Sequence, residues 1–424
     1  MMRALYSALA WALQPLLRLK LARRARAEPG YAVGVQERFG HYAGDPWPAD
    51  GRTLWVHAVS LGETRAAAVL LAALRARWPQ YRLLLTHGTA TGRAEGAGLL
   101  RAGDAQVWQP WDTPAAVRRF LAHFKPRLGI LLETEVWPNL AAGCAAAGVP
   151  LVLANARLSE PSLRRALRLA ALAVPAYRSL SAVWAQTADD AQRLRRLGAP
   201  VQGVFGNLKF DAAPDARQLQ QGRAWRAALA RPVVMLASSR EGEEAALLRV
   251  LQSLGEAARA VQWLIVPRHP QRFDEVAALI AAQGYSLARR SRWAEQPALP
   301  QGQAEVWLGD TLGEMALYYG MSDVALLGGS FAPLGGQNLI EAAACGCPLL
   351  LGPHTFNFEE AAELALQAGA AQRAADLAQA VPAALALLRD APRRQAMAQA
   401  AQQFAQAHRG AAERTCTALA AYLG

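Results

Sequence analysis

The chain has 424 residues, 53% of them hydrophobic and 18% charged, and this balance excludes an intrinsically disordered protein. The length is sufficient for two or three domains with large buried cores. No CxxC pair and no two histidines at zinc-ligand spacing are present, so we expect neither a disulfide framework nor a zinc site. Reduced, buried thiols are expected at Cys144, Cys345, Cys347 and Cys416.

The N-terminal segment carries half of the net charge of +12, because residues 1–26 contain six basic side chains and no acid. Between Arg3 and Arg18 lies an uncharged, mostly apolar stretch of 14 residues, shorter than the roughly 20 that cross a bilayer as a straight helix. The basic residues that follow oppose export as a signal peptide. We expect an anchor on the cytoplasmic membrane surface, and the alternative is an ordinary first helix packed on the domain. Its apolar contacts would come from Leu5, Leu9, Trp11, Leu13, Leu16 and Leu17.

Residues 27–206 alternate short apolar runs with helical patterns rich in Ala, Leu and Arg. This alternation predicts a parallel sheet with helices on both faces, a doubly wound domain. The predicted strands are 53–60, 81–88, 127–135, 149–157, 181–187 and 201–206.

A polar stretch, 207–222, is expected to bridge to a second domain of the same kind, 223–424. The region from Ala361 onward has helical spacing, and its last helices could pack back on the first domain. The fold class predicted is therefore α/β, with two Rossmann-like doubly wound domains. The second set of predicted strands is 232–240, 262–269, 304–310, 323–330 and 347–353.

The carboxyl ends of these strands are the expected ligand sites, because α/β sheets bind ligands there, and two such domains are expected to face a cleft. In the second half these ends are rich in Gly, Ser and Arg, which suit phosphate and hydroxyl groups. In GGSFAPLGGQNLIEAAA a helix is expected to start at Gln337 or Asn338. A nucleotide site in the second domain is predicted.

Absent motifs narrow the chemistry. GxxxxGK[ST] does not occur and no GxGxxG follows the first strand, which disfavours a P-loop enzyme and a dinucleotide oxidoreductase. No Asp-x-Asp is present to chelate a metal beside a diphosphate. Metal-free transfer of a nucleotide-activated group, that is glycosyl transfer, is what these absences favour.

In the first half, WVHAVSLGETRAA places Glu63 at the start of a helix. Glu63 either caps that helix or acts as a general base that accepts a proton from an attacking hydroxyl. A buried carboxylate needs a partner, which Arg157 or Lys209 could supply. Other polar residues that follow strands are Glu133, Glu135, Asn139, Asn155 and Arg157.

The ordered motifs WVHAVSLGETRAA, ETEVWPNL, NARLSEPS, GNLKFD, SSREGEE, VPRHPQRF, GDTLGEM and GGSFAPLGGQNLIEAAACGCPLLLGPHTFNF resemble those of the Kdo (3-deoxy-D-manno-octulosonic acid) transferases of lipopolysaccharide synthesis. The resemblance runs from the N-terminal segment to at least Glu360. It implies a GT-B glycosyltransferase that moves Kdo from CMP-Kdo to the tetraacyl disaccharide precursor of lipid A, with inversion, without a metal and without another cofactor.

Residue roles are carried over by motif. The resemblance places the catalytic base on Glu63 and support of the transition state on Glu133 and Lys209, with Glu135 as an alternative to Glu133. Many members have NPLE where this chain has NLIE, a small departure. The residues implied for CMP binding are Pro267, Arg268, Gly313, Glu314, Met315, Ser330, Asn338, Leu339, Ile340 and Glu341.

The expected partners are CMP-Kdo, the lipid A precursor and the cytoplasmic surface of the inner membrane, with no nucleic acid. Two alternatives stay open: a GT-B transferase that uses a UDP-sugar and another lipid acceptor, and a non-catalytic sugar-nucleotide-binding protein at the membrane surface. The number of Kdo units transferred and the oligomeric state are not determined by the sequence.

Overall fold

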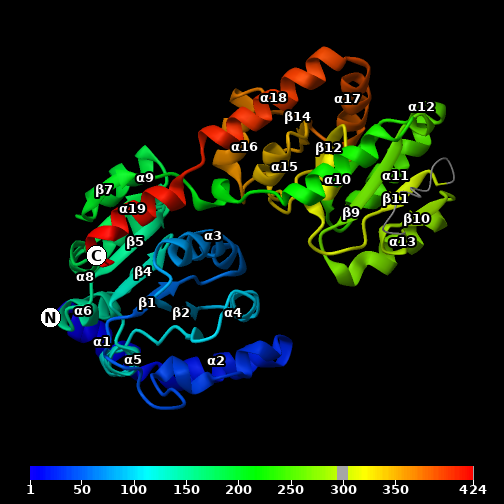
Figure 1. Cartoon of the computed structure of the whole chain (residues 1–424). Helices are drawn as coiled ribbons and strands as arrows, with labels where there is room; N and C mark the ends of the chain where they lie inside the picture. Colours follow the sequence, from blue (N-terminus) through cyan, green and yellow to red (C-terminus); the bar gives the residue numbers. More distant parts are fainter. Residues whose placement is uncertain (294–303, 424) are drawn as a thin grey trace. The chain divides into compact units, whose positions relative to one another are not determined.

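The structure is a computed structural model that describes residues 1–293 and 304–423. The chain forms two compact units (Figure 1). The first comprises Met1–Ala212 together with Arg409–Gly424, and the second comprises Ala213–His408. The first unit is therefore built from two separate stretches of sequence.

The first unit contains a parallel sheet that is seven-stranded in the described residues, in the order β3-β2-β1-β4-β5-β6-β7. Strand order reverses beside β1, as in doubly wound folds. The strands are β1 (Thr53–His57), β2 (Arg82–His87), β3 (Ala105–Trp108), β4 (Leu128–Leu132), β5 (Leu151–Ala156), β6 (Ala182–Ala185) and β7 (Val201–Val204). The helices are α1 (Met2–Ala12), α2 (Gln14–Ala27), α3 (Leu61–Arg77), α4 (Ala90–Ala97), α5 (Pro114–Phe124), α6 (Pro138–Ala146), α7 (Glu160–Arg168), α8 (Ala170–Arg178), α9 (Ala188–Arg196) and α19 (Ala411–Leu423), with 3-10 turns η1 (Pro29–Ala32), η2 (Val35–Phe39) and η3 (Leu208–Asp211).

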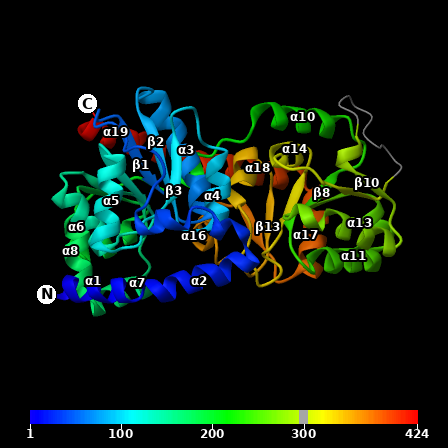
Figure 2. The same cartoon turned by 90° about the horizontal axis from the view of Figure 1, so that it is seen from below.

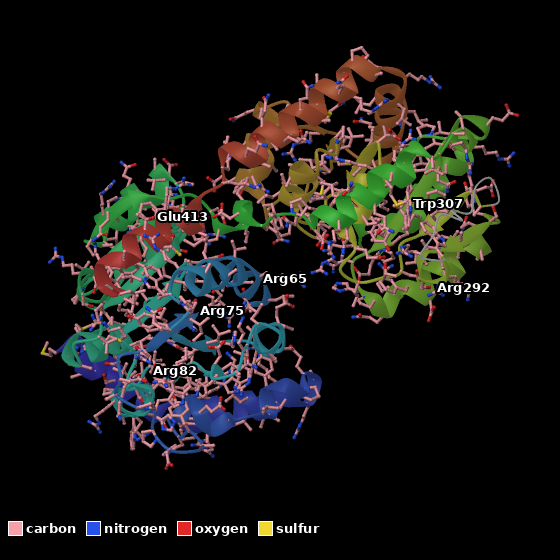
Figure 3. All side chains as sticks on the ribbon, in the orientation of Figure 1. Arg65, Arg75, Arg82, Arg292, Trp307 and Glu413 are labelled. Carbon is pink, nitrogen blue, oxygen red and sulfur yellow. The ribbon has the colours of Figure 1, made fainter. Side chains whose placement is uncertain are left out.

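Alternate residues of each strand serve the two faces of this sheet, since successive side chains of a strand point in opposite directions. Leu54 and Val56 join the core made with α3 and α19. Trp55 joins the opposite core, where its ring stacks edge-on against Phe120 of α5 at 4.9 Å. The last helix carries Glu413 to within 3.5 Å of the Arg77 guanidinium on α3 (Figure 3). Both faces are therefore covered, as the continuous apolar strands predicted.

The second unit repeats the architecture with the strand order β10-β11-β9-β8-β12-β13-β14, all parallel in the described pairs. Trp307 of β11, labelled in Figure 3, is buried in its interior. The strands are β8 (Val233–Ser239), β9 (Gln262–Pro267), β10 (Leu287–Arg289), β11 (Val306–Leu308), β12 (Val324–Leu327), β13 (Leu349–Leu351) and β14 (Ala371–Arg373). The helices are α10 (Ala216–Ala227), α11 (Glu243–Leu254), α12 (Glu256–Arg259), α13 (Phe273–Ala282), α14 (Met315–Gly320), α15 (Leu339–Cys345), α16 (Glu359–Gln367), α17 (Leu377–Arg389) and α18 (Ala391–Ala407), with η4 (Pro270–Arg272) and η5 (Arg290–Arg292).

The predicted α/β class is confirmed in both units. The stretch 207–222, expected to be a bridge, is divided: η3 belongs to the first unit, and α10, which begins at Ala216, is the first helix of the second unit. The cysteine prediction is also confirmed, because all four thiols are free and buried.

The N-terminal segment forms two helices, α1 and α2, which follow one another along one side of the first unit (Figure 2). No residue of α1 is buried, although this helix contacts α6 and α8. Helix α2 is fixed by Leu21, which is buried with Tyr31 and Trp108, and by Arg18, whose guanidinium lies 3.8 Å from the Phe39 ring centroid. Within the described residues, no helix combines the length and the hydropathy required for a membrane span.

Candidate active site

Glu63 lies at the start of α3, just beyond the carboxyl end of β1. Ser60 caps the helix by accepting the Glu63 N–H at 3.3 Å. The Glu63 carboxylate in turn accepts the Val59 N–H at 2.8 Å and the Ser60 hydroxyl at 3.0 Å. The capping contacts weighed as the plainer interpretation are therefore present.

The same carboxyl group has the electrostatics of a base. Burial raises the pKa of Glu63 to about 7; the bonds from Val59 and Ser60 oppose this shift, and the nearby carboxylates of Glu133 and Glu135 add to it. A carboxyl group that titrates near neutral pH can exchange a proton with substrate under physiological conditions. Capping and proton transfer are thus compatible, because within the described residues two donors hold this half-buried carboxylate.

Glu133 follows the neighbouring strand, β4, and the structure gives it both of the cationic partners considered from the sequence. Its carboxylate lies 3.7 Å from Arg157 Nη1 and 4.0 Å from Lys209 Nζ. Its backbone is left-handed, with φ of 59°, and its C=O accepts the Arg157 N–H at 3.2 Å. Positive φ is uncommon for a residue with a side chain and concentrates at functional sites.

Asn155, near the end of β5, holds the residue that precedes Lys209. It is buried and also left-handed, with φ of 51°. Its side-chain oxygen accepts the Leu208 N–H at 3.0 Å, and its own C=O accepts from Gln186 Nε2 at 2.9 Å. Leu208, the residue before Lys209, is therefore held by β5, which is the neighbour of β4 in the sheet. From the sequence, Asn155 was recognised only as a polar residue at a strand end.

Two other candidate residues of the first unit, Glu135 and Asn139, make different contacts. Burial raises the pKa of Glu135, and its carboxylate accepts the Trp137 indole N–H at 2.8 Å. Asn139 is buried and donates to the C=O of Asp112 at 2.8 Å, while its oxygen accepts the Ser7 hydroxyl at 2.9 Å. Asn139 thus joins α6 to α1 rather than contacting the Glu133 group.

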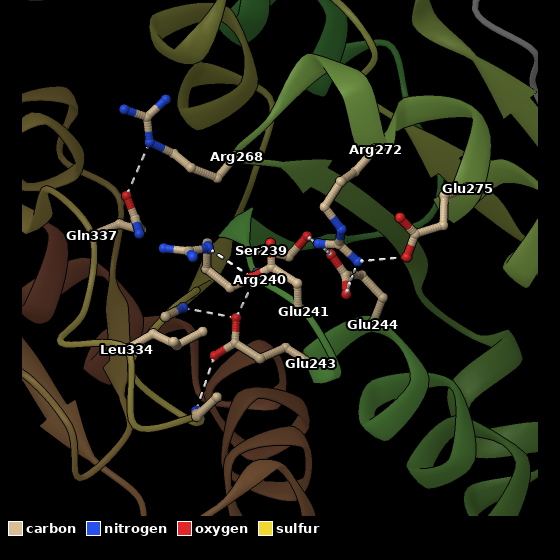
Figure 4. Close-up of polar contacts among 12 residues, drawn as sticks. Ser239, Arg240, Glu241, Glu243, Glu244, Arg268, Arg272, Glu275, Leu334 and Gln337 are labelled. Carbon is tan, nitrogen blue, oxygen red and sulfur yellow. Dashed lines mark hydrogen bonds and ion pairs between the residues drawn. The ribbon is translucent and has the colours of Figure 1, made fainter. Parts of the chain in front are cut away.

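In the second unit the glycine-rich loop after β12 is held by a carboxylate to which the sequence analysis gave no role. Glu243, with only 2% of its surface exposed, accepts the N–H groups of Gly329 and Arg240 at 2.7 and 2.9 Å on one oxygen. Its other oxygen accepts those of Phe331 and Ala332 at 3.1 and 3.3 Å. Burial raises the pKa of Glu243, against the opposing effect of these four bonds. Four donors fix the loop to the turn after β8 (Figure 4).

Arg268 follows Pro267, the last residue of β9, and donates through Nε to the side-chain oxygen of Gln337 at 3.2 Å (Figure 4). Its backbone N–H bonds to the C=O of Ser239 at 3.0 Å. Nearby, the buried pair Glu244–Arg272, 2.8 Å apart, stabilises the same turns. Arg268 and the loop that ends at Gln337 are thereby joined.

The GEM stretch meets the end of β8. Met315 begins α14, with its sulfur 3.9 Å from the Ser238 hydroxyl. Glu314 is paired with Arg290 at 2.8 Å, and the Gly313 C=O accepts from Gln218 Nε2 at 3.0 Å. The backbone and side chain of this turn are therefore held by α10 and by the segment after β10.

The NLIE stretch starts α15 where the sequence placed a helix start. Asn338 caps it by accepting the Ile340 N–H at 3.1 Å, Leu339 and Ile340 are buried, and Glu341 is half-buried on the first turn. Ser330 is fully buried; its hydroxyl donates to the Leu327 C=O and accepts the Gly352 N–H at 2.8 Å.

Two doubly wound parallel-sheet domains in one chain are the architecture of the GT-B fold, which is the class predicted from the sequence. The structure of UDP-GlcNAc 2-epimerase from Neisseria meningitidis bound to UDP-GlcNAc is similar, with a TM-score of 0.57 over 87% of this chain and all of that chain. Its sequence identity of 15% limits this likeness to the fold.

Sequence relatives give the family. The model of the family described as 3-Deoxy-D-manno-octulosonic-acid transferase (kdotransferase) matches residues 34–212. A 3-deoxy-D-manno-octulosonic acid transferase of Bordetella pertussis is 49% identical, covering 100% of both chains, and that of Haemophilus influenzae is 31% identical, covering 100% of this chain and 99% of its own. The chain belongs to the 3-deoxy-D-manno-octulosonic acid transferase family, and it is a glycosyltransferase.

Proposed function

We propose that the protein transfers Kdo from CMP-Kdo to the tetraacyl disaccharide precursor of lipid A, with inversion at the anomeric carbon and without a metal. The observation that carries this proposal is Glu63: a carboxyl group with a pKa near 7, beside the paired Glu133, in a chain 49% identical over its whole length to a Kdo transferase.

In this reaction Glu63 accepts the proton of the attacking acceptor hydroxyl, whose oxygen forms the new bond to the anomeric carbon of Kdo. The bond from that carbon to the phosphate oxygen breaks, and CMP leaves with the electron pair. Lys209, held near Glu133, supplies positive charge to the leaving phosphate. Glu133 keeps the lysine oriented, supported by the Asn155 contact to the preceding residue.

The second unit binds the donor. Glu341 accepts hydrogen bonds from the ribose hydroxyls, because one carboxylate can accept from two adjacent hydroxyls. Arg268 binds an anionic group of the donor through charge-assisted bonds. Asn338 and the GEM turn, Gly313 to Met315, complete the nucleotide contacts. Pro267, Leu339 and Ile340 are buried beneath the site. The Ser330 hydroxyl donates to Leu327 and accepts from Gly352, and these two hydrogen bonds hold the loop in place.

The N-terminal helices hold the enzyme at the cytoplasmic surface of the inner membrane. Exposed apolar side chains would enter the interface while the basic residues of α2 meet anionic headgroups. Leu17 is half-buried, whereas Leu19, which the sequence analysis omitted, is 50% exposed. The exposed apolar set is Leu5, Leu9, Trp11, Leu13, Leu16 and Leu19.

The test is product analysis. Purified protein, CMP-Kdo and the tetraacyl acceptor should give the acceptor enlarged by Kdo and release CMP, with unchanged rate in EDTA. Mass spectrometry of the product counts the units added. Failure with CMP-Kdo but transfer from a UDP-sugar would identify the alternative transferase, and nucleotide protection against thermal unfolding distinguishes the two, since a bound ligand stabilises by mass action.

A further inference from the structure

A second arginine, Arg240, lies beside the loop that Arg268 contacts. Arg240 follows the end of β8, and its backbone N–H is bonded to Glu243, which also holds the Gly329 N–H. A Cβ built on Gly329 would lie 3.1 Å from Gln337 Nε2 and 3.5 Å from Arg240 Cγ. Gln337 is in turn the residue that accepts from Arg268 Nε. Arg240 and Arg268 therefore both lie beside the part of the loop that contains Gly329 and Gln337.

Figure 4 shows both guanidinium side chains extending from neighbouring strand ends toward the loop that carries Gln337. The site is electropositive: both arginines lower the pKa of His269, although burial is the larger cause. The present partner of Arg240 is Glu241, 3.0 Å away, with side-chain exposures of 24% and 54%. Because Glu241 is exposed, water weakens this ion pair, so an incoming anion can replace Glu241.

The donor chemistry requires two cations. In a nucleotide ester of a 2-ulosonic acid, the carboxylate and the phosphate oxygen are attached to the same anomeric carbon, so two anionic groups lie side by side. Guanidinium forks match carboxylate and phosphate geometry, and a pair of them can hold both groups at once.

We propose that Arg240 is a second donor-binding residue, which binds the carboxylate of the CMP-linked 2-ulosonic acid while Arg268 binds the phosphate. This inference rests on the proposed function and deepens it, because it assigns recognition of the acid sugar to one residue. Glu243 is the positioning residue, since it fixes the backbone of Arg240 to the loop that holds Gln337.

The experiment compares the affinities for CMP and for freshly prepared CMP-Kdo, measured by protection against thermal unfolding. In Arg240→Gln, the dissociation constant of CMP-Kdo should rise about tenfold to a hundredfold, the scale for losing a charged hydrogen bond, while that of CMP stays within about twofold. Arg240→Lys, which keeps the charge without the fork, should recover part of the loss. Glu241→Gln should tighten CMP-Kdo binding, because it removes the competing carboxylate.

Arg249→Gln is the matched control, since Arg249 is exposed on α11 and its guanidinium donates to the C=O of Ala245 in the same helix. Equal weakening of CMP and CMP-Kdo in Arg240→Gln would overturn the assignment, as would unchanged CMP-Kdo affinity or a wild-type protein that binds the two nucleotides equally. Turnover is scored separately: a protein that discriminates CMP-Kdo through Arg240 but transfers no Kdo refutes the proposed function and leaves the binding assignment standing.

Discussion

Glu63 of the first unit and Glu243 of the second each lie near the start of a helix that follows the first strand of its sheet, yet their surroundings differ. Glu63 is half-buried, accepts from two donors and has carboxylates for neighbours. Glu243 is almost fully buried and accepts four backbone N–H groups. The number of donors and the exposure of the side chain therefore distinguish the carboxyl group that we propose as a base from the one that holds a loop.

The largest expected effect is on turnover at Glu63. Glu63→Gln should lower kcat by about 10² to 10⁴, the range for removing a general base, while CMP affinity stays nearly unchanged because the residues proposed to bind CMP lie in the other unit. Wild-type kcat/KM should rise with pH through about 7, since the base works only when ionised, and the variant should lack this limb. A variant with wild-type turnover would contradict the assignment.

The same carboxyl group links stability to pH, with a sign that can be checked. Its pKa is raised in the folded protein, so between the ordinary value of 4.5 and about 7 the folded state binds more protons than the unfolded state. The free energy of unfolding should therefore fall as pH rises through this window. Glu63→Gln should flatten that slope, as measured by urea unfolding at several pH values.

Changing Glu243 should affect stability and nucleotide affinity rather than the pH dependence of turnover. Glu243→Gln replaces an acceptor oxygen by an NH₂ group that faces backbone donors, and each unsatisfied buried group costs about 1 to 3 kcal/mol. We expect lower stability and CMP affinity weakened by about tenfold to a hundredfold, with no change in the pH limb near 7. Glu256→Gln, at an exposed position on α12, is the control. Undiminished CMP affinity in a folded Glu243→Gln protein would remove Glu243 from the donor site.

Glu341 differs from Glu243 in its proposed role, because we propose that Glu341 contacts the nucleotide directly whereas Glu243 holds a loop. Glu341→Ala should raise the KM for CMP-Kdo by about tenfold to a hundredfold, equivalent to about 1.5 to 3 kcal/mol for a hydrogen bond to a charged group. Unlike the change at Glu243, it should leave the unfolding midpoint nearly constant. Steady-state kinetics with varied donor, together with thermal unfolding, would show whether these two effects separate.

The smallest effect on chemistry is expected from the N-terminus. Deleting residues 2–26 should release much of the protein from anionic vesicles, since each basic residue contributes roughly 1 kcal/mol at such a surface. CMP binding should persist. The tertiary cost should be modest on the α1 side, where no residue is buried, and larger at Leu21, so Leu9→Ser with Leu16→Ser is a gentler companion variant. Full sedimentation of the deletion variant with vesicles at high salt would place the anchor elsewhere.

The sequence was sufficient for the fold class because central strands of parallel sheets are continuous apolar runs. The three strands that were not predicted, β3, β10 and β14, all lie at sheet edges in the described topology. Each strand has three or four residues, and at least two of these residues are partly exposed. Such short edge strands lack the long apolar sequence from which β4 and β8 were predicted.

Sequence reasoning offered Arg157 or Lys209 as the partner of a buried carboxylate, and both lie within 4.0 Å of the Glu133 carboxylate. It failed where the backbone decides. A glutamate in a first helical turn normally complements the helix dipole in solvent, so nothing in SSREGEE indicated that Glu243 would bind a loop 86 residues away. The left-handed backbone of Glu133 and Asn155 is likewise a property of the assembled sheet. The inward orientation of the Ser330 hydroxyl depends on Gly352, on another strand end.

Because the first unit is built from two separate stretches of sequence, it can be completed only after the second unit has been synthesised. Asp211 accepts the N–H groups of Gly410 and Ala412 at 2.5 and 2.6 Å, so the chain leaves and re-enters the first unit at the same place. The second unit is a continuous insertion that a ribosome finishes before α19 emerges, and domains fold as units as they appear. One face of the first sheet stays partly uncovered until α19 has been synthesised, because Leu419 of this helix is fully buried in the core on that face. A nascent chain stalled before Ala411 would therefore expose apolar surface to chaperones even with its second unit already folded.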